Sequence, residues 1–328
     1  MTRQPFGNKK TQRTKECAYA KINLFLQVDG KREDGFHELQ TVMHSVGLYD
    51  ELVLTLDCEG EDKVVFFSNS PYLPTDSRNL AVRAAELFKV RTGCAGFVRI
   101  DMKKRIPVAA GLAGGSSDAA AVLRACNRLF GYPLRMDELC ALAADLGSDV
   151  AFCLQGGTAL CRGRGEVMTA LEVKPNFAFV VATSPKEHVS TPAAFGLLDR
   201  AYADFDGSLS PRRPTSPSDM AEALRTGDMQ RIAACMHNDF ESVILPGCPG
   251  ATALRAAMLE HGALAAMMSG SGPSVFGIFP DYATSLRAAA ALGRFAHAVL
   301  SAPPFLFDGK KKSQVDGNMT EAVGKESI

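Results

Sequence analysis

The 328-residue chain has no excess of either charge, because 36 lysines and arginines balance 36 aspartates and glutamates. Proteins that bind nucleic acid usually carry a basic excess or patch, so we expect no nucleic-acid partner. The sequence also lacks an apolar run long enough to cross a bilayer, and we expect no membrane association. The first residues are polar and basic without an apolar stretch, which argues against a secretory signal and favours the cytoplasm.

Patterns that would give cysteine or histidine a structural or metal-binding role are also missing. The nine cysteines are odd in number and widely spaced, and no CxxC pair occurs, which argues against a disulfide framework and a zinc site. The six histidines form no HxxxH or HExxH pair. Most cysteines lie among apolar residues, so we interpret them as small buried side chains in a reducing compartment.

The most informative segment that is present reads PVAAGLAGGSSDAAA, residues 107–121. It follows an alternating run over 97–106 that predicts a strand, and it leads into an Ala/Leu-rich helix predicted over 118–130. A glycine-rich turn before a helix presents backbone N–H groups at the helix N-terminus, where phosphate binds. The segment therefore predicts a nucleotide-phosphate site, and a connector that binds nothing is the alternative.

Two better-known phosphate loops do not fit this segment. The GxxxxGK[ST] pattern needs a lysine where Gly115 precedes Ser116, and the glycine spacing differs from GxGxxG. Ser116, Ser117 and Asp118 suit the cap positions of the helix that follows.

Strand and helix patterns intersperse without a regular βαβ repeat, which predicts an α+β fold. We expect a first domain over 17–174, a second over 175–308, and disordered polar tails over 1–16 and 309–328. Strands are expected over 17–29, 48–57, 63–68, 97–106, 177–183, 263–268 and 275–279, a hairpin over 158–171, an exposed loop over 206–218, and helices over 79–92, 118–130, 136–146, 191–205, 218–225, 229–238, 251–261 and 282–292.

Two further motifs carry charged side chains. In AKINLFLQV, Lys21 and Asn23 are two residues apart and share one face of a strand, although a lysine whose stem packs while its ammonium reaches water would look the same. In LGSDVAFCLQGG, Asp149 follows a helix stop and is either a general base or a helix N-cap. Taken alone, the cap is the simpler interpretation.

Two loop motifs complete the set. In DGFHELQT, Phe36 and His37 suit recognition of a planar base, and a capped loop histidine is the alternative. The small-residue loop in MSGSGPSVF, residues 268–276, would let backbone approach a phosphate or the first glycine loop, unless it is simply a tight hairpin.

The order of these motifs resembles the kinase superfamily named for galactokinase, homoserine kinase, mevalonate kinase and phosphomevalonate kinase (GHMP). Within it, AKINLFL, DGFHELQT, LGSDVAF and SGSGPSVF together resemble the 4-diphosphocytidyl-2-C-methyl-D-erythritol kinase family, over about residues 17–302. The resemblance implies a two-domain fold, with an ATP-binding N-terminal domain like ribosomal protein S5 domain 2 and a ferredoxin-like C-terminal domain.

The resemblance also implies an activity. Kinases of this family transfer the γ-phosphoryl group of ATP to the 2-hydroxyl of a cytidyl diphosphate sugar alcohol in the non-mevalonate route to isoprenoids. ATP is then the co-substrate, Mg²⁺ bridges phosphate oxygens, and the partner is a small molecule. We expect a monomer or weak homodimer.

Individual roles follow from the same resemblance. Lys21 and Asp149 match the catalytic lysine and aspartate, and Asn23 would contact substrate near the transferred group. Phe36 and His37 match the cytosine site, with Phe195 as a second stacking face. The ATP phosphate loop is matched by Pro107, Val108, Ala109, Ala110, Gly111, Leu112, Ala113, Gly114, Gly115, Ser116 and Ser117, of which Ser117 is a candidate Mg²⁺ ligand.

The chain departs from the family pattern in two places. Phe36 stands where a tyrosine is often found, which preserves stacking and removes a phenol hydrogen bond. Ala109, Ala110 and Ala113 occupy positions that are often glycine, so the resemblance does not determine the backbone angles of the loop.

Other functions compete with this one. Another GHMP small-molecule kinase, such as mevalonate or homoserine kinase, would have no use for the cytosine site suggested by GFH and Phe195. A catalytically silent nucleotide-binding paralogue is expected to lack Lys21 or Asp149, and both are present. Covalent catalysis by Cys153 or Ser116 is disfavoured, because no histidine is near either in sequence.

Overall fold

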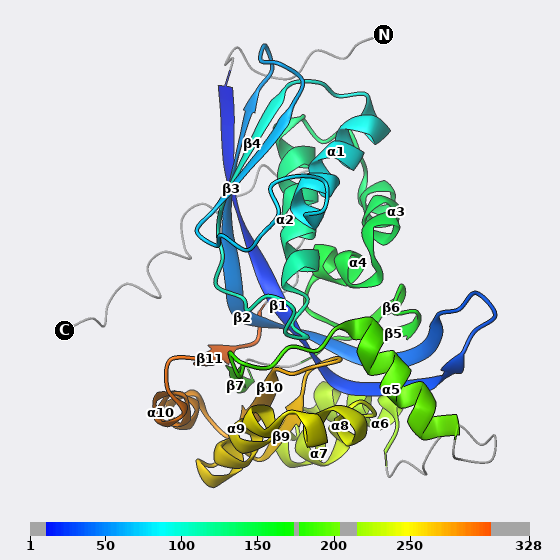
Figure 1. The fold of residues 1–328 in the computed structure, drawn as a ribbon, viewed down its shortest axis with the longest axis vertical. Helices are drawn as coiled ribbons and strands as arrows, with labels where there is room; N and C mark the ends of the chain where they lie inside the picture. Colours follow the sequence, from blue (N-terminus) through cyan, green and yellow to red (C-terminus); the bar gives the residue numbers. More distant parts are fainter. Residues whose placement is uncertain (1–10, 174–176, 204–214, 303–328) are drawn as a thin grey trace.

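Two β-sheets with helices packed against them form the protein in this computed structural model, which describes residues 11–173, 177–203 and 215–302 (Figure 1). Within that part of the chain, the larger sheet has seven strands: β1 (Thr11–Lys31), β2 (His37–Asp57), β3 (Val64–Ser68), β4 (Phe97–Lys103), β5 (Thr158–Gly163), β6 (Val167–Ala170) and β8 (His237–Asn238). The smaller has four: β7 (Ala178–Ala182), β9 (Ala265–Met268), β10 (Val275–Phe279) and β11 (Ala296–Leu300). This architecture confirms the predicted α+β class.

The helices divide between the two sheets. Four of them lie on one side of the larger sheet: α1 (Leu80–Thr92), α2 (Gly114–Leu129), α3 (Met136–Leu146) and α4 (Ser148–Gln155) (Figure 1). The rest follow in the second half: α5 (Thr191–Ala203), α6 (Pro217–Thr226), α7 (Met229–Cys235), α8 (Glu241–Ile244), the 3-10 turn η1 (Leu245–Gly247), α9 (Pro249–Glu260) and α10 (Tyr282–Leu292). No single helix in the described ranges is long and apolar enough to cross a membrane; α8–η1 and α9, bent by 108°, pass only as a pair.

The long antiparallel pair of β1 and β2 forms the main part of the larger sheet, and β1 carries the first residues of the functional site. It runs without a break in pairing direction from Thr11 opposite Asp57 to Lys31 opposite His37. The register shifts once just before Lys21 and again just after Asn23. Because a bulge bends a strand and redirects its side chains, these irregularities set the orientation of the two polar residues between them.

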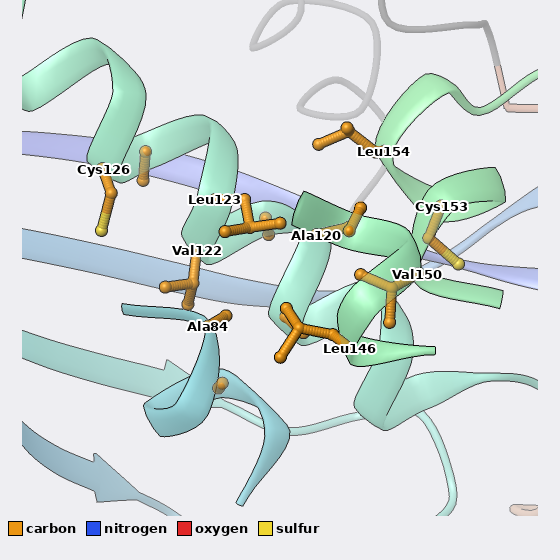
Figure 2. Close-up of a cluster of buried hydrophobic side chains, with 14 of the residues drawn as sticks. Ala84, Ala120, Val122, Leu123, Cys126, Leu146, Val150, Cys153 and Leu154 are labelled. Carbon is orange, nitrogen blue, oxygen red and sulfur yellow. The ribbon is translucent and has the colours of Figure 1, made fainter. Parts of the chain in front are cut away.

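Helix α2 is fixed by the core between the larger sheet and its helices. Its Val122 and Leu123 belong to one buried cluster with Ala84 of α1, Leu146 of α3 and Val150 of α4 (Figure 2). Alanines at successive turns of α2 let the neighbouring elements approach closely, and dense packing leaves little freedom to shift. The N-terminus of α2 is therefore held in a defined place.

Several predicted boundaries need correction. Residues 11–16, expected in a disordered tail, form the start of β1, where they pair with the end of β2. Helix α2 begins at Gly114 rather than Asp118, so Ser116, Ser117 and Asp118 lie inside its first turns and none of them is the cap. Residues 1–10 and 309–328 of the predicted tails and residues 206–214 of the loop predicted over 206–218 lie outside the described residues, whereas Pro217 at the end of that loop already begins α6. The predicted domain boundaries stay predictions.

The predicted helix over 229–238 is wrong at its end. Helix α7 stops at Cys235, since Met236 has the extended angles φ −60° and ψ 129°. His237 and Asn238 then pair in parallel with Phe25 and Leu26 of β1. The local sequence pattern predicted a helix as far as residue 238. Pairing with a strand more than 200 residues earlier in the chain makes residues 237–238 extended instead.

The connection from β4 to α2 contains two alanines in the left-handed region. Ala109 has φ 53° and Ala113 has φ 54°, on either side of Gly111 at φ 76°. The left-handed conformation costs an L-residue roughly 1–2 kcal/mol, and glycine avoids that cost. Ala109 and Ala113 therefore adopt the left-handed angles that suit glycine, at a cost in strain, and the loop does not take a different conformation.

We expect Ala109→Gly and Ala113→Gly each to raise the free energy of unfolding by about 0.5–1 kcal/mol, because the strain relieved exceeds the added entropy of the unfolded chain. Ala110→Gly is the matched control, since Ala110 is buried and has no positive φ. It should lower stability. Urea denaturation followed by circular dichroism measures all three, and destabilisation of both left-handed variants would contradict the explanation.

A buried histidine joins the two sheets. His44 on β2 is 1% exposed, with Nδ1 2.7 Å from Thr158 Oγ1 and Nε2 2.8 Å from Ser301 Oγ. The aromatic rings of Phe177 and Phe179 lie against it. Burial lowers the pKa of His44 to about 4, because the charged ring would lose its hydration.

This lowered pKa predicts a loss of stability in mild acid. Between pH 6.5 and about 4 the unfolded chain binds a proton that the folded chain does not, so His44 should cost about 2 kcal/mol of stability between pH 7 and pH 5. His44→Gln, which cannot titrate, should lose less over this interval in urea titrations. As an independent check, the His44 ring resonances in NMR should not titrate above pH 5; a midpoint near 6.5 would refute the assignment.

Candidate active site

Two glycine-containing loops meet at the centre of the site. The hydroxyl of Ser269 donates to the carbonyl of Gly111 at 3.1 Å, and the amide of Ser274 donates to the carbonyl of Ala110 at 3.3 Å. A Cβ atom on Gly111 would lie 2.2 Å from the Ser269 carbonyl oxygen, so only glycine fits there. The loop over 269–273 thus packs on the predicted phosphate loop, one of the two contacts expected of it.

The phosphate loop leads directly into α2. Ala113 is the N-cap of this helix, and no side chain in the described ranges caps it. The first N–H groups of a helix point outward along its axis and attract anions. Gly115 is exposed at this end, so the helix terminus where a phosphate is expected to bind is open to solvent.

Lys21 lies beside this loop on β1. Its backbone N–H donates to the carbonyl of Leu112 at 3.2 Å, and its Nζ donates to Asn23 Oδ1 at 2.7 Å. Asn23 in turn donates to Thr41 Oγ1 at 2.8 Å, and Thr41 donates to the carbonyl of Phe25. Lys21 is 5% exposed, which excludes the alternative of an ammonium that reaches bulk water. Thr41 went unnoticed in the sequence because nothing local marks a threonine across a strand pair.

Asp149 completes a charged pair with Lys21. It lies in the first turn of α4, whose N-cap is Gly147, so the alternative that Asp149 is itself the cap is wrong. Its Oδ2 is 3.7 Å from Lys21 Nζ, and its side chain is 36% exposed. A buried ammonium faced by a partly open carboxylate is an arrangement that can hold and deprotonate a hydroxyl group.

The predicted base-binding residues separate into two groups. The rings of His37 and Phe195 stack at 4.3 Å with 19° between their planes, and His37 Nε2 lies 2.6 Å from Asp199 Oδ1. Phe36 is 54% exposed and lies under the guanidinium of Arg164 at 4.8 Å. The structure thus brings His37 and Phe195 together, whereas Phe36 stacks on an arginine.

Asp199 was missed in the sequence, although a signal for it exists. It follows Phe195 by four residues on α5, which is one helical turn and therefore the same face. It also lies 3.6 Å from the Nζ of Lys31, so two basic groups approach one carboxylate.

An ion network beneath the phosphate loop was also missed. Lys104 Nζ lies 2.5 Å from Asp50 Oδ2 and 2.7 Å from Asp118 Oδ2, and it would be 3.0 Å from a Cβ on Gly114. Asp50 accepts the backbone N–H of Ile106 as well. Burial raises the pKa of Asp118 to about 7, against the opposing effect of Lys104. The network ties β2, the start of the loop and α2 together.

The candidate metal ligand does not fit in this conformation. The Ser117 hydroxyl donates to the carbonyl of Gly114 at 3.0 Å, and the residue is 1% exposed. Among the described residues, no group of three or more His, Cys, Asp or Glu side chains could hold a metal ion. The side chains of residues 11–173, 177–203 and 215–302 therefore form no cluster that could hold Mg²⁺ by itself.

Comparisons with known proteins identify the family of the chain. Family models for the GHMP kinase N-terminal domain and C-terminal domain match residues 79–157 and 220–298. A 4-diphosphocytidyl-2-C-methyl-D-erythritol kinase of Caldicellulosiruptor saccharolyticus is 42% identical over 283 residues, 86% of this chain and 94% of the relative. One of Bacillus cytotoxicus is 44% identical over 80% of this chain and 86% of its own length.

Solved structures agree as well. A crystal structure of 4-(cytidine 5'-diphospho)-2C-methyl-D-erythritol kinase, 35% identical, superposes with a TM-score of 0.71 over 88% of this chain and all of that one. A mevalonate kinase of L. major gives 0.72 over 92% and 98%, but at 18% identity this shows the fold alone. The identity, the coverage and the shared fold together confirm the resemblance found in the motifs, and the chain belongs to the 4-diphosphocytidyl-2-C-methyl-D-erythritol kinase family of the GHMP kinases.

Proposed function

We propose that this protein transfers the γ-phosphoryl group of ATP to the 2-hydroxyl of 4-diphosphocytidyl-2-C-methyl-D-erythritol. The products are the 2-phosphate and ADP, in the non-mevalonate route to isoprenoids. The observation that carries the proposal is the Lys21–Asp149 pair, placed beside two interlocking glycine loops at the open end of α2. The family supports the choice of acceptor.

Charge stabilisation is the main task of such a site, since phosphoryl transfer passes through a loose transition state. In the proposal, the loop over 107–117 and the N–H groups of α2 bind the phosphates of ATP. The buried ammonium of Lys21 offsets negative charge on the transferred group, and Asn23 holds that ammonium by the 2.7 Å hydrogen bond. Mg²⁺ bound to phosphate oxygens stays a prediction.

Asp149 is proposed to orient the acceptor hydroxyl and to take its proton. A carboxylate is a far weaker base than an alkoxide, so the proton moves late, as the bond to phosphorus forms. The position of Asp149 in the first turn of α4 suits an anionic side chain, because that helix end carries a partial positive charge.

Cytosine recognition is proposed for the residues around His37. Asp199 fixes the His37 ring through Nε2, which leaves Nδ1 for a hydrogen bond to the base. His37 and Phe195, with centroids 4.3 Å apart, leave no space for a third ring between them. The base would therefore stack on the outer face of this pair or on Phe36.

A cytoplasmic location and a monomer or weak homodimer without nucleic-acid or membrane partners are further parts of the proposal.

The acceptor is tested by ADP release with three alcohols. The cytidyl substrate should give a kcat/KM at least about 100-fold above mevalonate and homoserine, since only it can use the His37 region. Phe195→Ala should raise KM for the cytidyl substrate about tenfold and leave KM for ATP unchanged. Phe295→Ala, at an exposed phenylalanine between α10 and β11, should change neither. No turnover of the cytidyl substrate would overturn the proposal.

Replacement of Asp149 tests the chemistry. Asp149→Asn should lower kcat by about 10²–10⁴-fold, because the amide cannot accept the proton, while ATP affinity stays within about threefold. Asp145→Asn is the matched control, four residues earlier and paired with Arg91 on the surface, and it should retain full activity. Turnover by fluorescence-monitored ADP release and binding by calorimetry measure the two effects. Substantial kcat in Asp149→Asn would show that another group accepts the proton.

A further inference from the structure

The segment HNDFE, residues 237–241, crosses from the second half of the chain to the strand that carries Lys21. Its first two residues form β8, which pairs in parallel with Phe25 and Leu26 of β1. Asp239 extends this attachment, because its backbone N–H donates to the carbonyl of Leu26 and its Oδ2 accepts the N–H of Val28 at 2.8 Å. The segment is thus registered against β1 by backbone and side chain together.

Asn238 uses its amide group to hold the second glycine loop. Its Nδ2 donates to the carbonyl of Met268 at 2.8 Å and to the carbonyl of Gly270 at 2.9 Å. Its Oδ1 accepts the N–H of Phe240 at 3.0 Å, which fixes the amide orientation. Because the residue is 5% exposed, water cannot replace these three bonds.

Glu241 holds the same loop from a second side. Its Oε1 accepts the backbone N–H of Met268 at 2.8 Å. Both backbone groups of Met268 and the carbonyl of Gly270 are therefore bound by two side chains three residues apart in the segment.

The loop so held lies against the groups proposed for catalysis. A Cβ on Gly270, which has φ +57°, would be 3.4 Å from Lys21 Nζ, 3.3 Å from Asn23 Oδ1 and 3.2 Å from the carbonyl of Gly111. A shift of this loop by even an ångström would therefore press on the lysine, on its hydrogen-bond partner and on the phosphate loop, or leave them unsupported.

We propose that Asn238 is a positioning residue, which acts through the carbonyls of Met268 and Gly270 to set the loop over 269–273 against Lys21, Asn23 and Gly111. All three hydrogen bonds of its amide go to backbone groups of the protein itself. The inference rests on the proposed role of Lys21, but its structural part, the placement of the two loops, stands independently of the acceptor.

Asn238→Asp is the most selective variant, because the carboxylate still accepts the N–H of Phe240 but loses both donors and faces two carbonyl oxygens. It should lower kcat about 10–100-fold with KM for ATP and for the cytidyl substrate within about threefold, as expected when the ground state still binds but the reacting groups are misplaced. Asn238→Ala should do the same or more.

Asn127→Asp is the matched control. Asn127 lies on α2, is 1% exposed, donates to the carbonyl of Leu134 and accepts the N–H of Leu134. Asn127→Asp therefore also keeps the hydrogen-bond acceptor and loses the donor, but within the helical layer. It should lower Tm to a similar extent with kcat within about twofold. Assays at a temperature where circular dichroism shows every variant folded separate positioning from stability.

Glu241 supplies a second pair should the Asn238 variants fail to fold. Glu241→Gln keeps an oxygen for the N–H of Met268 and should have near-normal kcat, whereas Glu241→Ala removes it and should lose about 3–10-fold.

Hydrogen exchange reads the placement of the loops without any substrate. In Asn238→Asp, and in Glu241→Ala relative to Glu241→Gln, amide protons in peptides over 266–275 and 107–113 should exchange faster than in Asn127→Asp. Normal kcat together with unchanged exchange would overturn the proposal, as would a loss of kcat no larger than that of the control. If the wild-type enzyme fails to phosphorylate the cytidyl substrate, the proposed function fails, and the exchange result alone decides the placement.

Discussion

The contact of backbone on backbone between Gly111 and the loop over 269–273 is the constraint on which the site depends. With a Cβ only 2.2 Å from a carbonyl oxygen, no other residue can occupy position 111 without moving one loop. Once the two loops lie this close, their remaining contacts follow. Ser269 and Ser274 donate hydrogen bonds to carbonyl groups of the phosphate loop, and Gly270 lies close to the ammonium of Lys21. Each half of the chain supplies one of these loops, so the site exists only where the halves are in register.

That register is maintained by two different kinds of support. On one side, α2 is locked by apolar packing against α1, α3 and α4, and the buried Lys104 with its two aspartates anchors the start of the phosphate loop. On the other side, directed hydrogen bonds from Asn238 and Glu241 hold a loop of small residues that has almost no side chains to pack. Packing suits a helix with many methyl groups, whereas a glycine loop can be held only through its own backbone groups.

Much of the fold was predictable because its signals are local. The alternating run over 97–106, the helix predicted over 79–92 and the hairpin predicted over 158–171 all correspond to elements in the structure. Lys21 and Asn23 were paired correctly because period-two geometry alone puts them on one face.

What the sequence could not predict depends on contacts between distant residues. Asp50 and Asp118 are 68 positions apart and meet at Lys104 only after the sheet forms. Asn238 looked like the end of a helix because its partners, Leu26 and Gly270, are distant in sequence, one near the start of the chain and the other 32 residues later. The stacking of His37 on Phe195, and not of Phe36, likewise depends on where α5 crosses the β1–β2 hairpin.

The two-residue strand β8 also bears on how the enzyme comes into being. Strand β1 is an outer strand of its sheet until residues 237–238 pair with it, so a nascent chain leaves this edge open until those residues have been synthesised. The loop over 269–273 emerges later still, and Lys21 gains its full surroundings only then. A fragment that ends before residue 269 therefore contains the helical layer and the phosphate loop, but it lacks the loop that surrounds Lys21.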